Sequence, residues 1–240
     1  MEGMEYARSV RPSMSDVAVI VPFAGDEPYR LAAAERVRRY YDGFFPGWNY
    51  VVASPAAGDA AFSRAAVLNA TIARTDSEVI VFNDADSLVE PHAMRRAAQL
   101  AGEEHGLVHA YTRYRRLSRA ATERLSMDAP NLWSLPDAAY EWEMVNAGSQ
   151  GCAAISRYAF DTVGGLDECF VGWGYEDLAF MVVCEAHWPL RRVAGDLVHL
   201  WHPPSERSQP DLERANEDRY FDRYVPLRGD RERLRALVGA

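Results

Sequence analysis

Two aspartates that follow a run of β-forming residues are the first candidates for chemistry. The stretch VIVFNDADSLVEP covers residues 79–91, and Asp84 and Asp86 stand on either side of Ala85 where the apolar run ends. Hard divalent cations prefer carboxylate oxygens, and Mg²⁺ typically takes one or two carboxylates together with substrate phosphates. Acidic turns are also common on protein surfaces, so this segment alone favours a solvated turn over a metal site.

Two histidines near the end of the chain could complete such a site. The stretch DLVHLWHPP carries His199 and His202 directly before two prolines. Imidazole suits Mn²⁺ and other borderline metals. A buried histidine bonded to the backbone beside an exposed one explains this segment equally well. We interpret the other histidines as structural, namely His92, His105, His109 and His187.

A pair of adjacent carboxylates forms the third candidate. The stretch GLDECFVGWGYEDLAF, residues 165–180, places Glu176 and Asp177 after two glycines and Trp173. An aromatic ring is a platform for the apolar face of a sugar, and a carboxylate against an apolar wall can act as a general base because its pKa rises. Acidic residues that complement the dipole of a helix N-terminus are the alternative interpretation, and this segment alone favours it.

Composition excludes several classes of function. The chain of 240 residues has a formal net charge of −9, which argues against a broad nucleic-acid or anionic membrane surface. Its basic residues are all arginine, so Schiff-base chemistry and a P-loop lysine are excluded. Three isolated cysteines fit a reducing compartment, and no apolar run approaches a membrane span or a signal peptide. We therefore expect a cytoplasmic protein.

The elements that must position these residues alternate between strand and helix in the first part of the chain. We predict strands at 17–23, 49–54, 78–83 and 106–111, and helices at 27–45, 62–75 and 91–104, the second of them capped by Ser63. This alternation predicts a parallel, doubly wound sheet with right-handed crossovers. Ligands of such sheets bind at the carboxyl ends of the strands, where Asp84 and Asp86 lie.

The second part of the chain is less regular. We predict a partly helical segment at 112–126 and a long ordered loop at 127–150 that contains two tryptophans. A strand at 151–156, helices at 157–163 and 178–187, and a strand-like segment at 191–202 follow. The charged tail, residues 205–238, is predicted to be helical in two pieces.

These segments together resemble the GT-A-fold glycosyltransferases, nearest to β-1,4-galactosyltransferases, polypeptide N-acetylgalactosaminyltransferases and chondroitin-polymerising enzymes. The family's parts stand in its order over residues 17–204: VIVPF, FSRAAVLNATIA, VFNDADSLVEP, GSQGCAAISRYAFDTVGGLDECFVGWGYEDLAF and HLWH. The resemblance implies an α/β fold with a doubly wound, mostly parallel sheet. It also implies one domain over 1–240, with a nucleotide-binding half at 17–111, a catalytic half at 112–204 and a helical tail at 205–240.

The resemblance also implies roles for individual residues. Asp86 and His202 would hold the metal, with Asp84 and His199 as further metal-site residues, and Asp177 would be the general base beside Glu176. Trp173, Gly174, Tyr175 and Glu176 would contact the acceptor, although galactosyltransferases usually have glycine where Tyr175 stands. Residues implied to contact the donor nucleotide or its sugar are Pro22, Phe23, Ala24, Asp26, Arg64, Asn69, Asp84, Ala85, Gly148, Ser149 and Gln150.

The activity implied by the resemblance is transfer of a sugar from a nucleoside diphosphate donor, by default UDP, to an acceptor hydroxyl. It would need Mn²⁺ or Mg²⁺ and proceed with inversion at the anomeric carbon. The acceptor could be a glycan, a protein, a lipid-linked sugar or, against the acidic charge, a modified base. The all-arginine composition fits a bacterial or bacteriophage source. The alternatives are a nucleotidyltransferase on a similar sheet and a binding module that has lost catalysis.

Overall fold

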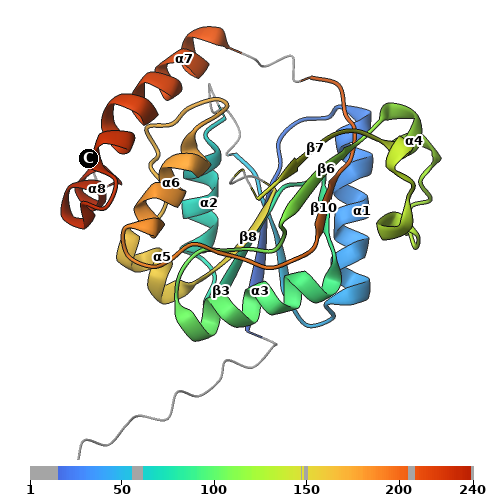
Figure 1. The fold of residues 1–240 in the computed structure, drawn as a ribbon, viewed down its shortest axis with the longest axis horizontal. Coiled ribbons are helices and arrows are strands. Elements are labelled where there is room, and N and C mark those ends of the chain that lie inside the picture. The colour runs from blue at the N-terminus through green and yellow to red at the C-terminus, as the bar shows by residue number, and fades with distance from the viewer. Residues whose placement is uncertain (1–15, 56–61, 147, 149–150, 205–208, 239–240) are drawn as a thin grey trace, which may run out of the picture.

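Two β-sheets form the framework of the protein, and helices cover the larger one on both faces (Figure 1). The computed structural model describes residues 16–55, 62–146, 148, 151–204 and 209–238. The main sheet has the strand order β2-β1-β3-β8-β5-β9, and the second has the order β4-β10-β6-β7. The strands are β1 (Val17–Pro22), β2 (Asn49–Ala53), β3 (Val79–Asn83), β4 (Ser87–Val89), β5 (Val108–His109), β6 (Arg113–Leu117), β7 (Tyr140–Val145), β8 (Cys152–Ser156), β9 (Arg191–Arg192) and β10 (Asp196–His199).

The helices lie where apolar residues recur at helical spacing, and their starts carry the expected signals. Pro28 and Pro91 stand in the first turns of α1 and α3, and the Ser63 side chain accepts from the Ala66 amide to cap α2. In the described residues no helix has both the length and the apolar character that a membrane crossing requires. The helices are α1 (Pro28–Phe44), α2 (Arg64–Ile72), α3 (Pro91–Glu104), α4 (Arg119–Arg124), α5 (Arg157–Val163), α6 (Glu176–Glu185), α7 (Pro210–Arg219) and α8 (Arg231–Val238), with shorter turns at Leu132–Ser134, Asp137–Ala139, Tyr220–Tyr224 and Val225–Leu227.

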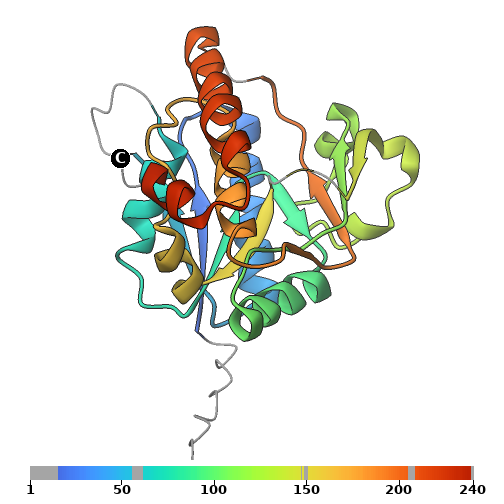
Figure 2. The same cartoon turned by 60° about the vertical axis from the view of Figure 1, so that its left-hand side comes forward.

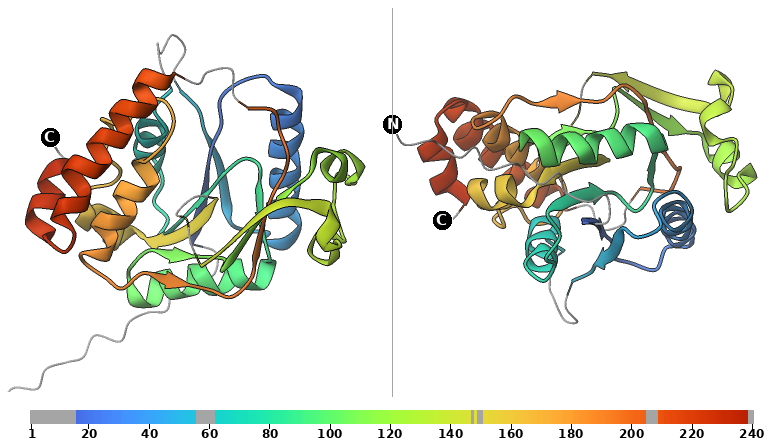
Figure 3. Two further views of the ribbon diagram at one scale, coloured as in Figure 1. Left: turned by 45° about the horizontal axis from the view of Figure 1, so that its top comes forward. Right: turned by 90° about the horizontal axis from the view of Figure 1, so that it is seen from below.

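The core consists of two apolar clusters, one on each face of the main sheet. Alternate residues of a strand point to opposite faces, so Val19 of β1 packs with α1 and α3 while Ile20 packs with α2, α5 and α6. Figure 3 shows α1 and α2 on opposite sides of β1 and β2. Both faces of β1 and β3 are therefore buried, which explains why these strands read as continuous apolar runs.

The main sheet is mixed, which corrects part of the sequence prediction. The strand predicted at 106–111 is only Val108–His109, and it does not pair with β3. The antiparallel strand β8 lies between them and pairs with both. The pairs β1–β2, β1–β3 and β5–β9 are parallel, so the sheet remains mostly parallel as predicted. Alternation of strand and helix could not reveal a strand that inserts from a later part of the chain.

The second sheet as a unit was not predicted, because β6 and β7 lie where we expected a helical segment and a loop. Strand β10 does lie within the predicted strand-like segment at 191–202. In β6 the arginines hide the strand pattern, since their charges are neutralised by residues that are distant in sequence. Arg113 forms a bidentate pair with Asp196, both contacts being 2.7 Å. Arg115 is buried between Asp137 and Glu143 and stacks on the ring of Tyr140 at 3.5 Å. Strand β7 pairs with β6 and ends in the segment that leads to β8.

The tail forms two helical pieces, as predicted, and lies against α6 (Figure 2). It is fastened by Asp167, whose side chain is 3% exposed. Asp167 Oδ2 accepts hydrogen bonds from Arg219 Nε at 2.7 Å and from the Tyr224 hydroxyl at 2.6 Å. The tail is thereby joined to the first part of the candidate segment at 165–180.

We expect Tyr224→Phe to lower the free energy of unfolding by about 2 kcal/mol, because a buried carboxylate loses a short hydrogen bond. Urea denaturation measures this loss. The matched control is Tyr158→Phe, whose side chain is 61% exposed and whose hydroxyl has no hydrogen bond among the contacts of the described residues. Equal stability of the two variants would show that the Asp167 contact does not fasten the tail.

Candidate active site

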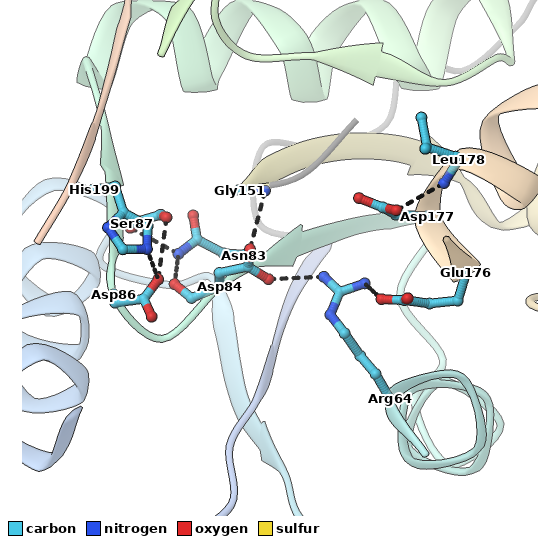
Figure 4. A network of polar contacts seen from close by, with 10 residues as sticks. All are labelled: Arg64, Asn83, Asp84, Asp86, Ser87, Gly151, Glu176, Asp177, Leu178 and His199. Atoms are coloured by element: carbon cyan, nitrogen blue, oxygen red, sulfur yellow. Dashed lines mark hydrogen bonds and ion pairs between the residues drawn. The ribbon is translucent and has the colours of Figure 1, made fainter. Parts of the chain in front are cut away.

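The turn after β3 is held by the side chain of Asn83, which is 1% exposed. The Tyr41 hydroxyl donates to Asn83 Oδ1 at 3.0 Å, and Asn83 Nδ2 donates to the carbonyls of Asp84 at 2.8 Å and Ser87 at 2.9 Å. The amide group therefore fixes the turn, and Asp84 and Asp86 leave it in different directions (Figure 4). Sequence reasoning missed Asn83, although its place at the end of a buried strand beside two aspartates was a signal.

Asp86 lies between the two histidines that the sequence singled out. Its Oδ1 is 3.5 Å from His199 Nε2, and its Oδ2 is 3.2 Å from His202 Nε2. One ligand atom from each of the three residues falls within 4.8 Å of the others. A backbone hydrogen bond holds the same two segments together, since the Leu200 amide donates to the Asp86 carbonyl at 2.8 Å. Strand β10, which pairs with β4, thus brings His199 and His202 to the turn.

The tautomer of His202 follows from its second contact. Its Nδ1 lies 2.8 Å from the carbonyl oxygen of Pro203. A carbonyl oxygen only accepts, so Nδ1 carries the proton and the Nε2 of the neutral ring presents a lone pair to Asp86. Two lone pairs that face each other at 3.2 Å need a shared proton or a cation between them. The donor set of one carboxylate and two imidazoles fits Mn²⁺ or a similar borderline metal ion.

Charges around this cluster favour an ionised Asp86. Burial raises its pKa, but the neighbouring His199 and His202 and the guanidinium of Arg30 outweigh burial and hold that pKa well below its usual range. Burial lowers the pKa of His199, whereas the hydrogen bond to Asp86 raises that of His202 above its usual value against the effect of burial. A permanently negative carboxylate beside two ring nitrogens is a suitable cation site.

Asp84 belongs to a different group of contacts. Its Oδ1 accepts from Arg64 at 2.8 Å, and its Oδ2 accepts from the Gly151 amide at 3.0 Å. The Asp84 amide in turn donates to the Gly151 carbonyl at 2.9 Å. Asp84 is therefore not part of the three-residue cluster around Asp86, although the sequence had proposed it for the metal site. Gly151 has a φ of +92°, and a Cβ there would lie 2.4 Å from Leu197, so glycine is required.

Arg64 joins the aspartate turn to the acidic pair of α6. Besides Asp84 it contacts Glu176, with 3.4 Å between Arg64 Nη1 and Glu176 Oε1. Burial lowers the pKa of Arg64, but the charges of Asp84, Glu176 and Asp177 raise it above its usual value, so the guanidinium stays charged. One cation cannot neutralise three carboxylates. Burial and the charge of Asp177 raise the pKa of Glu176 to about 7, since Arg64 lies closer to Asp84.

Asp177 faces a cavity between the aspartate turn and α6. Its Oδ1 accepts from the Leu178 amide at 2.8 Å (Figure 4). Helix α6 begins at Glu176, two residues earlier than predicted, so the two carboxylates also occupy the first helical turn, as the alternative interpretation proposed. The cavity is lined by Arg64, Phe82, Leu107, Gly151, Cys152, Ala153, Leu166, Asp177 and Phe180.

The residues predicted to contact the donor occupy two regions. Pro22 ends β1, and the following Phe23 binds the backbone of Ala53 at 2.9 Å, which leaves Ala24 half-buried and Asp26 exposed beyond the strand. Ala85 is half-buried in the aspartate turn. Gly148 accepts from Arg192 at 2.5 Å. Ser149 and Gln150 lie outside the described residues.

Asn69, which the resemblance implies is a donor contact, binds the turn that precedes α6. Its Nδ2 donates to the Leu166 carbonyl at 2.8 Å and to Glu168 at 2.9 Å, and its Oδ1 accepts from the Leu166 amide at 3.0 Å. The amide group therefore holds the 165–168 turn rather than the aspartate turn. A contact between Asn69 and a nucleotide remains a prediction.

The predicted acceptor segment is shaped by the tail. Trp173 is 75% exposed, while the Asn216 side chain of α7 donates to the carbonyls of Val171 at 3.0 Å and Trp173 at 3.2 Å. Tyr175 has a φ of +71° and directs its hydroxyl to Glu217 of the tail at 3.0 Å. Gly174 also has a positive φ, so the chain turns sharply before α6. Sequence reasoning did not foresee the role of Asn216, which lies in the charged tail.

Comparison with known proteins identifies the family to which this sequence is similar. The sequence model described as glycosyltransferase like family 2 matches residues 45–190. Comparison with curated protein sequences gave no match.

Three solved structures are similar to this chain, and the two with a TM-score above 0.5 illustrate the likeness in fold. GalNAc-T7 with UDP, GalNAc and Mn²⁺ has a TM-score of 0.55 at 12% identity, over 90% of this chain and 48% of that chain. The catalytic domain of Drosophila β-1,4-galactosyltransferase 7 with xylobiose has a TM-score of 0.51 at 17% identity, over 84% of this chain and 79% of that chain. A mutant of that enzyme with manganese, UDP-Gal and xylobiose has a TM-score of 0.45 at 18% identity, over 74% of this chain and 64% of that chain. The protein has the predicted GT-A fold, and it spans about half of the GalNAc-T7 chain.

We expect Asp86→Asn and His202→Ala each to weaken Mn²⁺ binding by at least about 100-fold. Mutating residues that only support the ligands of a metal ion already lowers metal affinity about 10- to 100-fold, and these two residues are proposed as ligands themselves. Electron paramagnetic resonance of Mn²⁺, alone and with UDP, measures the affinity. The control is His92→Gln, an exposed residue of α3, which should bind as the wild type does. Undiminished binding by Asp86→Asn would exclude this cluster as the metal site.

We expect Glu176→Gln to flatten the dependence of stability on pH. The pKa of Glu176 is about 7 in the folded chain against an ordinary 4.5, so between these values the folded state binds more protons than the unfolded state. Wild-type stability therefore falls as the pH rises through this range. Glutamine is neutral throughout, so from about pH 5 to about pH 8 the variant should gain about 1–3 kcal/mol on the wild type in urea denaturation.

The control for this prediction is Glu185→Gln, an exposed glutamate at the other end of α6. It should keep the wild-type slope. A Glu176→Gln variant with that same slope would mean that Glu176 titrates normally in the folded protein.

Proposed function

Since this chain belongs to the glycosyltransferases of the family described as glycosyltransferase like family 2, we propose that it moves a sugar from a nucleoside diphosphate to an acceptor hydroxyl with the help of a divalent metal ion. The family match covers more than half of the chain, which makes the protein a transferase. The donor, the metal ligands, the base and the stereochemistry are the parts that we propose.

One observation carries the proposal. Asp86 stands between His199 and His202 at the carboxyl edge of the main sheet, and Asp177 faces a cavity that also reaches Gly151 and Arg64. A cation site and a carboxylate thus lie on two sides of the Asp84–Gly151 contact (Figure 4). A donor diphosphate on one side and an acceptor hydroxyl on the other would bring the anomeric carbon between them.

The donor side rests on Asp86, His199 and His202, which would hold Mn²⁺ or Mg²⁺. A bound metal ion offsets the charge that develops on the departing diphosphate. Asp84, fixed by Arg64 and Gly151, would face the ribose or a metal-bound water. UDP is the donor nucleotide we favour, because the structure of GalNAc-T7 contains UDP and Mn²⁺. Further donor contacts are proposed from Pro22, Phe23, Ala24, Asp26, Asn69, Ala85 and the 148–150 segment.

The acceptor side rests on Asp177. The acceptor oxygen would attack the anomeric carbon from the face opposite the diphosphate, and its proton would pass to the Asp177 carboxylate. The bond from the anomeric carbon to the diphosphate oxygen breaks, and its electrons leave with the nucleoside diphosphate, so the configuration inverts. The raised pKa of Glu176 supports Asp177 as the base, since a half-protonated neighbour adds less negative charge beside it. Trp173, Gly174 and Tyr175 would bound the acceptor.

The proposed unit draws on both halves of the chain. Asp86 lies within 17–111, whereas His199, His202 and Asp177 lie within 112–204, and the contacts between them support treating 17–204 as one catalytic unit. The tail would support the acceptor segment through Asn216. Membership of the glycosyltransferase family argues against the nucleotidyltransferase alternative. The presence of both the cation cluster and the acidic pair argues against a binding module that has lost catalysis.

We expect Asp177→Asn to reduce transfer by about 10²- to 10⁴-fold, the usual contribution of a general base. Release of UDP from UDP-sugars in the presence of a panel of hydroxyl acceptors measures the rate. Mn²⁺-dependent binding of UDP should be unchanged, because Asp177 does not belong to the cation cluster. The control is Asp161→Asn, an exposed aspartate of α5. Normal turnover by Asp177→Asn would remove it as the base.

A further inference from the structure

Three buried polar atoms without a hydrogen-bond partner gather at the carboxyl ends of β5 and β9. They are both ring nitrogens of His109 and the Nη1 of Arg192. His109 is 0% exposed, and it pairs in register with Arg192 on the neighbouring strand. Buried polar groups in proteins nearly always have partners. Three unsatisfied atoms in one place therefore indicate a partner that the described residues do not supply.

The cluster continues the wall of the cavity that Asp177 faces. Phe82, Ala153, His109 and Arg192 occupy one row across β3, β8, β5 and β9. The first two of them line that cavity. Neighbouring strands are about 4.8 Å apart, so Arg192 lies about 10 Å along the row from Ala153. His109 therefore stands between the cavity and the Arg192 side chain.

His109 also points to the correct face of the sheet. Successive residues of a strand alternate between faces, and Leu107 lines the cavity while Val108 packs on the opposite face. His109 thus shares the face of Leu107. The sequence had suggested a structural histidine here. The Cys152 backbone lies near the ring and acts on its pKa, yet no hydrogen bond of normal geometry reaches either ring nitrogen.

The charge of the cluster favours an anionic partner. Arg192 donates from Nη2 to the Gly148 carbonyl, its guanidinium carbon lies 5.8 Å from the centre of the Tyr111 ring, and its side chain also interacts with the Tyr111 hydroxyl, which leaves Nη1 without a partner. Among the ion pairs of the described residues none involves Arg192, whereas the adjacent Arg191 pairs with Glu104 at 3.1 Å. A half-buried cation without a carboxylate is costly unless an anion joins it. Burial and the Arg192 charge lower the pKa of His109 to about 3, so the ring is neutral and can donate one N–H.

We propose that Arg192 and His109, beside Tyr111, form a subsite for a carboxylate or phosphate group carried by one of the two substrates. A guanidinium and an N–H donor on neighbouring strands match the oxygens of such a group. This inference rests on the proposed function and names a chemical feature of its substrates. The group belongs to the donor if the sugar next to Gly148 is a uronic acid, and to the acceptor if it enters past Asp177.

The first experiment follows the side-chain resonances of His109 by NMR in ¹⁵N-histidine-labelled protein. Inorganic phosphate is titrated without UDP, and again with saturating UDP and Mg²⁺ so that the diphosphate site is filled. We expect a saturable shift of the His109 resonances in the wild type. Arg192→Met should weaken this binding by at least about tenfold, the value of one charged hydrogen bond. Arg191→Met, the adjacent exposed arginine, should bind phosphate as the wild type does.

The second experiment identifies the substrate that carries the anion. Binding of UDP-glucuronate is compared with that of UDP-glucose by calorimetry in the presence of Mg²⁺. A wild-type preference of at least about tenfold for the uronate that disappears in Arg192→Met places the group on the donor. Equal donor affinities together with phosphate binding in the presence of UDP-glucose place it on the acceptor. Arg192→Lys, which keeps the charge, should retain part of either effect even if Arg192→Met folds poorly.

The result that overturns the inference is a His109 resonance that phosphate does not move, together with equal affinities for the two donors. Phosphate binding that is unchanged in Arg192→Met would overturn it equally. The cluster would then hold only water. These outcomes are separate from a failure of the proposed function, which would appear as a wild type that does not bind UDP with a divalent metal ion. The titration without UDP tests the subsite even in that case.

Discussion

Carboxylates buried at the end of β3 impose the main constraint on this structure. Asp84 and Asp86 leave the central strand next to each other, and neither side chain is well solvated. A buried negative charge is tolerated only with donors or cations around it. Arg64 and the Gly151 amide donate hydrogen bonds to Asp84, and two histidines lie beside Asp86. Even so, the Asp86 side needs a proton or a cation to separate facing lone pairs, and that need connects the fold to metal-dependent chemistry.

The second sheet and the tail hold in place the segments that surround these buried carboxylates. Strand β10 pairs with β4 and carries His199 to the aspartate turn, so the second sheet positions the proposed cation site. Strand β7 leads the chain back to Gly151, which must be glycine because Leu197 of β10 packs against it. On the other side the tail supports the 165–177 segment through Asp167 and Asn216. Arg192 is a comparable case beside the wall of the cavity, since none of the ion pairs between described residues gives this cation a carboxylate.

How much of this was predictable depended on how local each feature is. The helix cap at Ser63 and the apolar strands β1 and β3 depend on residues that are neighbours in the sequence, and they were predicted. The site residues Asp86, His199, His202 and Asp177 were proposed from their chemistry and from the family resemblance, and the structure brings the first three together. Strand β6 was missed because its arginines are neutralised by Asp137, Glu143 and Asp196, which no periodicity reveals. The insertion of β8 and the separation of Asp84 from Asp86 are likewise tertiary, so the sequence alone did not contain them in readable form.

The central claim is that a divalent cation sits between Asp86 and the two histidines while a nucleoside diphosphate is bound. Crystals grown with MnCl₂ and UDP, measured at the manganese absorption edge, test it most directly. The account predicts a strong anomalous peak in contact with the Asp86 carboxylate and His202 Nε2, with the diphosphate of UDP on its open side. UDP bound without a peak at this position, or a peak held by other residues, would contradict the account.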